Sequence, residues 1–101
     1  MTSVFKLLRA AEWSSFKAAG VFAGSADDRR DGFIHLSADD QVAATRAKYF
    51  ADEPDVVLLA LDAEALGAAL RWEASRGGAR FPHLYRALRV EEVRLVPPSP
   101  G

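Results

Sequence analysis

The chain has 101 residues, of which 50% are hydrophobic and 27% are charged, and its net charge is −1. This length suffices for one core and excludes a second domain or a large enclosed cavity, so any ligand site is expected to be a surface groove. The balanced charge disfavours nucleic acid and anionic membranes as partners. The lack of cysteine excludes disulfides, thiolate metal sites and cysteine nucleophiles.

No apolar run reaches the roughly 18 residues that span a bilayer, and the N-terminus lacks the layout of a signal peptide. We therefore expect a cytoplasmic protein. The charge is unevenly distributed, because residues 23–64 carry −6 and residues 65–101 carry +3. All six basic residues of the last third are arginines. They suit phosphate or carboxylate contacts, or they reflect the preponderance of arginine in the whole chain.

The first third of the chain predicts a strand, a helix and a connection. Residues 4–8 read as the strand, and the segment around Trp13 and Phe16 as a short helix. Gly20 ends that helix, because glycine readily adopts the left-handed conformation there. Residues 23–30 are expected to be a polar connection.

Residues 33–36 form a β-rich run that ends at Ser37, which occupies the position of a helix N-cap. Asp39 and Asp40 would lie in the first turn of that helix. Apolar residues recur behind them at helical spacing: Ala43, Ala47 and Phe50. Farther on, residues 56–61 are an unbroken apolar run, typical of a central strand covered on both faces.

Asp62 can cap a short helical turn, after which residues 71–73 read as extended. Gly77 and Gly78 turn the chain toward a second aromatic segment, residues 81–85. Pro82 within it favours an edge strand or a strand start. A last short strand is expected over residues 93–96.

Helices and strands do not alternate as βαβ units, so the sequence predicts an α+β domain with a mixed or antiparallel sheet and short helices. Residues 1–96 would form the single globular domain. Residues 97–101 would be a flexible proline-rich tail.

Strand periodicity orients the two histidines. It places Phe33, His35 and Ser37 on one face, opposite two aliphatic residues that belong in the core. In the second aromatic segment it places His83 and Tyr85 together. Two histidines, a hydroxyl and a phenol could then converge.

Glu73 could join this cluster as the carboxylate that orients a neutral imidazole titrating near neutrality. The alternative is that each histidine is half-buried with local partners, that Ser37 is only a cap, and that Trp13 and Trp72 belong to the core or its rim. Two histidines 48 positions apart without thiols disfavour a zinc site. The chain has no Walker loop, dinucleotide-binding glycine fingerprint or nucleophile elbow.

Several short motifs occur together, in addition to Trp13 and Gly20: Gly32-Phe33-Ile34-His35-Leu36-Ser37 with downstream Gln41, a leucine-rich strand ending in Asp62, Leu70-Arg71-Trp72-Glu73, and Phe81-Pro82-His83-Leu84-Tyr85. From about Val4 to Val96 the chain thereby resembles the bacterial domain of unknown function family 952. Arg86-Ala87 departs from the family, in which a glycine is expected after the tyrosine.

The resemblance implies an ADP-ribosyltransferase-like fold, a small split sheet with NAD in the cleft between its halves. It implies that His35 contacts the NAD ribose, and that Glu73 or Tyr85 stands for the catalytic glutamate and the stacking aromatic. RNA 2′-phosphotransferases share this fold, and the arginine-rich third could take their phosphate. No activity is established for the family, and a fold does not fix a function.

The leading hypothesis is a groove for a nucleotide, NAD or another anion, with ADP-ribosyl transfer or related ribosyl or phosphoryl chemistry. NAD would be a substrate, and no metal is expected. The candidate catalytic residues are His35 and Glu73, and the candidate ligand-binding residues are Ser37, Trp72, His83 and Tyr85. The alternatives are a non-catalytic module that binds a ligand or a protein, and a dimer interface built from the aromatic segments.

Overall fold

The computed structural model describes residues 2–75 and 77–97, so the predicted tail lies almost wholly outside the described residues. The strands are β1 (Ser3–Arg9), β2 (Val21–Phe22), β3 (Ile34–His35), β4 (Ser37–Ala38), β5 (Val56–Asp62), β6 (Leu70–Ala74), β7 (Arg80–Leu84), β8 (Leu88–Arg89) and β9 (Val93–Val96). The α-helices are α1 (Ala10–Ala19), α2 (Ala26–Asp31), α3 (Val42–Tyr49) and α4 (Ala63–Leu66), and the 3₁₀ turns are η1 (Asp39–Gln41), η2 (Gly67–Ala69) and η3 (Val90–Glu92).

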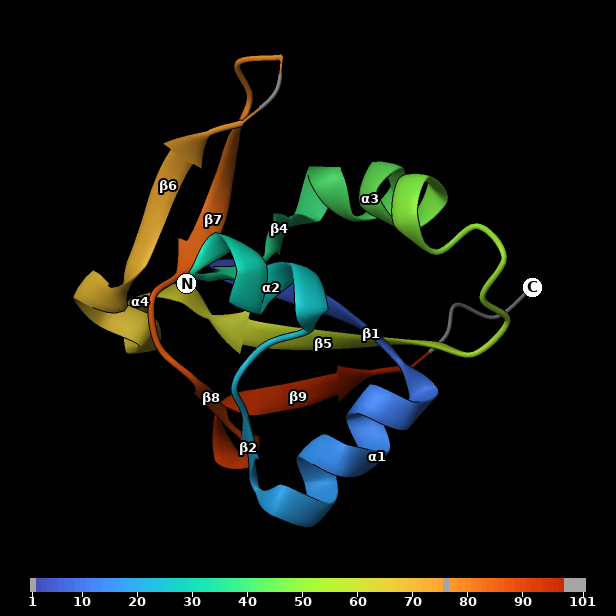
Figure 1. Cartoon of the computed structure of the whole chain (residues 1–101). Coiled ribbons are helices and arrows are strands. Elements are labelled where there is room, and N and C mark those ends of the chain that lie inside the picture. The colour runs from blue at the N-terminus through green and yellow to red at the C-terminus, as the bar shows by residue number, and fades with distance from the viewer. Residues whose placement is uncertain (1, 76, 98–101) are drawn as a thin grey trace.

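The α+β prediction is confirmed, and every strand pair of the described chain is antiparallel. The strands form a four-stranded sheet in the order β4-β1-β5-β9, a three-stranded sheet in the order β3-β7-β6, and the pair β2-β8. In Figure 1 the β6–β7 hairpin projects to one side of the larger sheet, with α2 lying in front. No helix of the described residues is long and apolar enough to cross a membrane.

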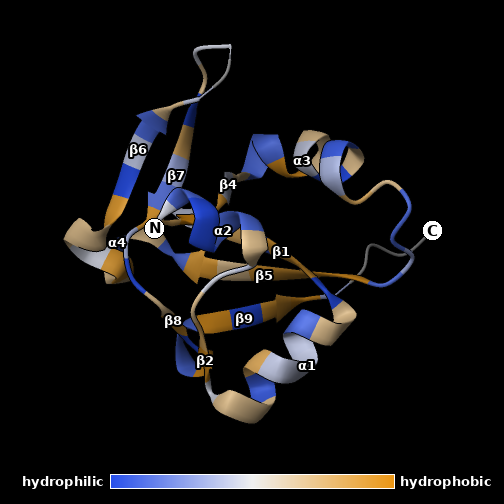
Figure 2. Ribbon diagram, viewed as in Figure 1, coloured by the Kyte–Doolittle hydropathy of each residue, from blue (hydrophilic) through white to orange (hydrophobic). Residues whose placement is uncertain are grey.

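The apolar run over residues 56–61 forms the inner strand β5, as predicted. It pairs along its whole length with β1, and Leu59, Ala60 and Leu61 are buried. Figure 2 shows both strands as predominantly hydrophobic. The core therefore forms where two long apolar strands lie side by side and α1 contributes Phe16.

Helix α1 ends as predicted at Gly20, whose φ of 79° is left-handed and whose N–H donates to Phe16 O at 2.7 Å. The prediction of a connection over residues 23–30 is wrong, because α2 lies there. Ser25 caps this helix: Ser25 Oγ accepts from Asp28 N at 3.2 Å, and Asp28 Oδ2 accepts from Ser25 N at 2.9 Å. This reciprocal capping box was present in the sequence as two cap-forming residues three apart.

The prediction that His35 and Ser37 share a strand face is wrong, because the chain changes sheets between them. His35 pairs with His83 in the smaller sheet, and Ser37 pairs with Phe5 in the larger one. Leu36 lies at the change, where its N–H donates to Pro82 O at 3.0 Å. One residue thus links β3 in the smaller sheet to β4 in the larger one, and the period-two rule applies only within each strand.

The predicted N-cap at Ser37 is also wrong, since its side chain donates to Thr45 Oγ1 at 3.3 Å and the turn η1 begins two residues later. Helix α3 follows, but Ala43 and Ala47 are exposed. The face toward the sheet carries Thr45 instead. Small alanines contribute little apolar area, so their spacing did not identify the buried face.

The β6–β7 hairpin turns at Gly77 and Gly78, as predicted, and both have left-handed φ values of 86° and 84°. The prediction that Pro82 marks an edge strand or a strand start is wrong, because β7 is the middle strand of its sheet and Pro82 is its third residue. A middle strand tolerates this proline for a local reason. The carbonyl of Pro82 faces β3, and the nitrogen of the same residue faces the same side. Because β3 ends at His35, no carbonyl of β3 requires a hydrogen bond from the nitrogen of Pro82. The predicted cap at Asp62 is confirmed by its bond from Glu64 N at 3.1 Å.

Candidate functional site

Polar and aromatic side chains gather on the outer face of the three-stranded sheet. The register places His83 between His35 on β3 and Arg71 on β6. Because side chains alternate along a strand, Glu73 shares this face with Arg71. The opposite face carries buried Leu84 and packs into the core.

Glu73 is held by two donors of this face. His83 Nδ1 lies 2.8 Å from Glu73 Oε1, and Tyr85 donates its hydroxyl proton to the same oxygen at 2.6 Å. A carboxylate only accepts, so the Nδ1 atom of His83 carries the proton. The second oxygen of Glu73 makes no side-chain bond within the described chain. Glu73 therefore presents an oriented carboxylate, with 37% of its side chain exposed.

The same contacts shift two pKa values. The hydrogen bond from Tyr85, followed by that from His83, lowers the pKa of Glu73 below its ordinary 4.5, and partial desolvation opposes the shift. The bond to Glu73 raises the pKa of Tyr85 above its ordinary 10.0. At neutral pH the pair is thus a carboxylate and a neutral phenol.

Phe33 lies at the centre of the aromatic contacts. Its ring stacks on His83 at a centroid distance of 4.0 Å and lies 4.6 Å from His35 and 5.4 Å from Tyr85. The sequence placed Phe33 on the histidine face but did not identify it as a site residue. It orients the rings, because it contacts three of them.

His35 has a different environment, in which both ring nitrogens face carboxylates. Nδ1 lies 2.6 Å from Asp28 Oδ1, and Nε2 lies 2.9 Å from Asp31 Oδ2. The backbone N–H of His35 also donates to Asp28 at 3.0 Å. A ligand can hydrogen-bond to a ring nitrogen of His35 only by displacing a carboxylate, and Asp31 is the more exposed of the two.

A buried ion pair lies behind His35. Lys6 Nζ is 3.0 Å from Asp28 Oδ2 and donates to the His35 carbonyl at 3.0 Å. Burial alone would raise the pKa of Asp28, but hydrogen bonds from His35 and the charge of Lys6 outweigh it and hold this pKa well below its ordinary value. The sequence patterns did not predict this pair. The available signal was Lys6, a charge on the inward-facing side of an apolar strand.

The structure brings together four predicted site residues, His35, Glu73, His83 and Tyr85, around Phe33. It does not bring Ser37 to them, because Ser37 is buried in the other sheet. Trp72 lies on the opposite face of β6 from Glu73. There it borders a hollow of about 560 Å³ between the two sheets, together with Phe5, Asp39 and Asp40.

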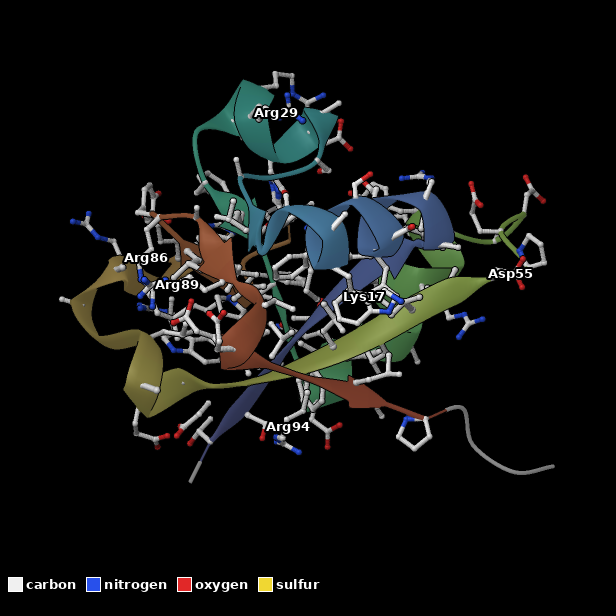
Figure 3. All side chains as sticks on the ribbon, turned by 90° about the horizontal axis from the view of Figure 1, so that it is seen from below. Lys17, Arg29, Asp55, Arg86, Arg89 and Arg94 are labelled. Atoms are coloured by element: carbon white, nitrogen blue, oxygen red, sulfur yellow. The ribbon has the colours of Figure 1, made fainter. Side chains whose placement is uncertain are left out.

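A second hollow, of about 350 Å³, adjoins the outer face, and we call it the arginine groove. Phe33 and Tyr85 line it along with Arg29 and Arg86. In Figure 3, Arg29 lies on α2 and Arg86 on the segment that follows β7. Arg86 is paired with Glu92 through two bonds of 2.9 and 2.6 Å, and Arg29 donates Nε to Gly24 O at 3.1 Å. Within the described residues, no three His, Asp or Glu side chains are grouped as metal ligands.

A family model described as protein of unknown function (DUF952) matches residues 7–96. The chain belongs to this family. The DUF952 chain is also similar to the crystal structure of protein CC0527 from Caulobacter crescentus, at 58% identity and a TM-score of 0.90 over 94% of this chain and 84% of that one. The solution NMR structure of CC0527 gives 60% identity and a TM-score of 0.83 over 93% and 81%.

No curated protein matches the DUF952 chain. The match of the family model confirms the family resemblance seen in the sequence motifs. None of the matched structures is described as ADP-ribosyltransferase-like, so that relationship stays a prediction.

Proposed function

We propose that this protein binds a nucleotide such as NAD, or another phosphorylated riboside, on the outer face of the three-stranded sheet and in the arginine groove. The reaction would be ADP-ribosyl transfer, NAD hydrolysis or related ribosyl chemistry, as expected of an ADP-ribosyltransferase-like fold. The observation that carries the proposal is the ionised carboxylate of Glu73, fixed by His83 and Tyr85 beside a hollow lined with aromatic rings and arginines.

An oriented carboxylate suits the breaking of a glycosidic bond. The bond electrons leave with the base, and positive charge develops on the anomeric carbon and the ring oxygen. Glu73 would stabilise that charge, while water or an acceptor hydroxyl adds to the carbon and releases its proton to solvent. Glu73 cannot act as the acid at neutral pH, because its pKa is lowered.

Two predicted ligand-binding residues are left out of this proposal. Ser37 is 5% exposed, and Trp72 faces the other hollow. His35 would contact the ribose only after Asp31 moves away from its Nε2 atom. Because both ring nitrogens of His35 already have carboxylate partners, the geometry also favours the alternative function, a non-catalytic module that binds the ligand without turning it over.

The proposal is tested by titrating NAD and ADP-ribose to millimolar concentration and following amide NMR shifts and nicotinamide release. We expect shifts at Phe33 and Tyr85, with turnover abolished in Glu73→Gln but retained in the control Glu91→Gln, an exposed acid on η3. Binding without turnover in the unmodified protein supports the non-catalytic module. The absence of any shift at millimolar ligand contradicts both functions.

A further inference from the structure

We propose that Arg71 is the anion-binding residue of this site and selects ligands that carry a phosphate beside the reacting sugar. The inference rests on the proposed function and specifies its substrate class. The sequence offered Arg71 for anion contacts only as one of six arginines in the last third, and Arg71 does not line the arginine groove, but the structure places it on the same face as Glu73.

Arg71 differs from the groove arginines in its contacts. Within residues 2–75 and 77–97, no carboxylate oxygen lies within 4.0 Å of its guanidinium, whereas Arg86 is bound at both terminal nitrogens by Glu92. The guanidinium of Arg71 lies 5.1 Å above the centroid of the Tyr85 ring. Stacking on an aromatic face leaves the N–H groups at the edge of a guanidinium available. Arg71 is thus a positioned cation with no salt-bridge partner among the described residues, although its charge acts on nearby Glu73.

Tyr85 links this cation to the carboxylate. Its ring lies under Arg71 and its hydroxyl binds Glu73 at 2.6 Å, so one side chain orients both charges. This arrangement reduces the side-chain freedom that binding would otherwise remove.

The spacing of the two charges restricts the ligand. The hydrogen bond from Tyr85 lowers the pKa of Glu73 the most, and Arg71 is close enough for its charge to help, although no salt bridge within 4.0 Å joins Arg71 and Glu73 among the described residues. A phosphate bound bidentately by Arg71 avoids repulsion by the Glu73 carboxylate only on the side of the guanidinium that faces away from it. The ligand must carry its anion and its electron-poor carbon on separate groups, as a 5′-phosphorylated riboside does.

The test compares binding of inorganic pyrophosphate, ADP-ribose and unphosphorylated adenosine to four proteins: unmodified, Arg71→Ala, Arg71→Lys and Arg94→Ala. Arg94 is the matched control, because it is an exposed arginine on β9 that lies away from the labelled groove arginines in Figure 3. We expect Arg71→Ala to weaken pyrophosphate and ADP-ribose binding at least tenfold, Arg71→Lys to weaken it less, and Arg94→Ala to leave it unchanged. Adenosine should bind all four proteins equally, or none of them.

Equal affinities of Arg71→Ala and Arg94→Ala for both phosphates would overturn the inference. So would pyrophosphate shifts confined to Arg29 and Arg86. If pyrophosphate binding depends on Arg71 but neither ADP-ribose nor NAD binds, the anion site stands and the proposed nucleotide function fails. Circular dichroism of the variants confirms that lost binding is not lost folding.

Discussion

The two histidines lie on neighbouring strands with their rings 5.8 Å apart, yet they belong to opposite kinds of site. Both ring nitrogens of His35 are bound by carboxylates, and the inner one, Asp28, is buried and neutralised by a buried lysine. The carboxylate that binds His83 is itself open to solvent. An imidazole–carboxylate pair thus stabilises the fold where the acid is buried with a cation. Where the acid is exposed, the pair instead holds an oriented carboxylate at the surface.

The largest difference in stability between the His35 site and the His83 site should appear when the buried acid, Asp28, is removed. Asp28→Ala leaves Lys6 buried without its counter-charge, which costs about 3 to 5 kcal/mol. For a chain of this size the Tm should fall by more than about 10 °C in a thermal scan. The control Asp27→Ala removes an exposed acid from the same helix and should change the Tm little. Equal Tm values for the two variants would show that the buried pair is not structurally important.

A smaller difference in unfolding free energy should separate one substitution from each site, His35→Ala and Glu73→Gln. His35→Ala removes a hydrogen bond to a buried, charged partner and should cost about 1.5 to 3 kcal/mol, toward the lower end because its side chain is 37% exposed. Glu73→Gln changes a partly exposed acid without altering its shape, so urea unfolding should scarcely detect it. If Glu73→Gln is the more destabilising variant, the result contradicts the view that His35 and its carboxylates stabilise the fold while Glu73 does not.

The smallest effect is a titration. Tyr85→Phe removes the hydrogen bond that lowers the pKa of Glu73 the most, so this pKa should rise toward 4.5. Because the folded-state pKa is lowered, the ionised form prevails at neutral pH and protonates as the pH falls below 4.5. The side-chain carboxyl NMR signal of Glu73 reports the change. The control Tyr49→Phe, which changes an exposed tyrosine on α3, should leave the titration of the Glu73 carboxyl signal unchanged.

Much of the fold was predictable from local patterns. The strand over residues 56–61 and the helix end at Gly20 depend on hydrophobic runs and glycine geometry, which act over a few residues. The errors at Ser37 and Pro82 share a different cause. Both positions are set by the change of sheet at Leu36, which results from tertiary pairing and leaves no local signal.

The candidate site was predictable in part. Alternation along two strands placed the histidines and Tyr85 on matching faces, and the structure brings them together. The sequence could not show that α2 supplies two carboxylates to His35, because residues 23–30 read as a polar connection and not as a helix. It also could not show which arginine stacks on Tyr85, since that depends on the register of β6 with β7.

The buried lysine has a consequence for how the protein unfolds. Lys6 belongs to the larger sheet, Asp28 to α2, and the carbonyl that Lys6 binds belongs to the smaller sheet. An intermediate in which the smaller sheet and α2 detach from the larger sheet loses all of these charge-assisted bonds at once. Such an intermediate is penalised, so the two sheets should exchange their protected amides with solvent as one cooperative unit.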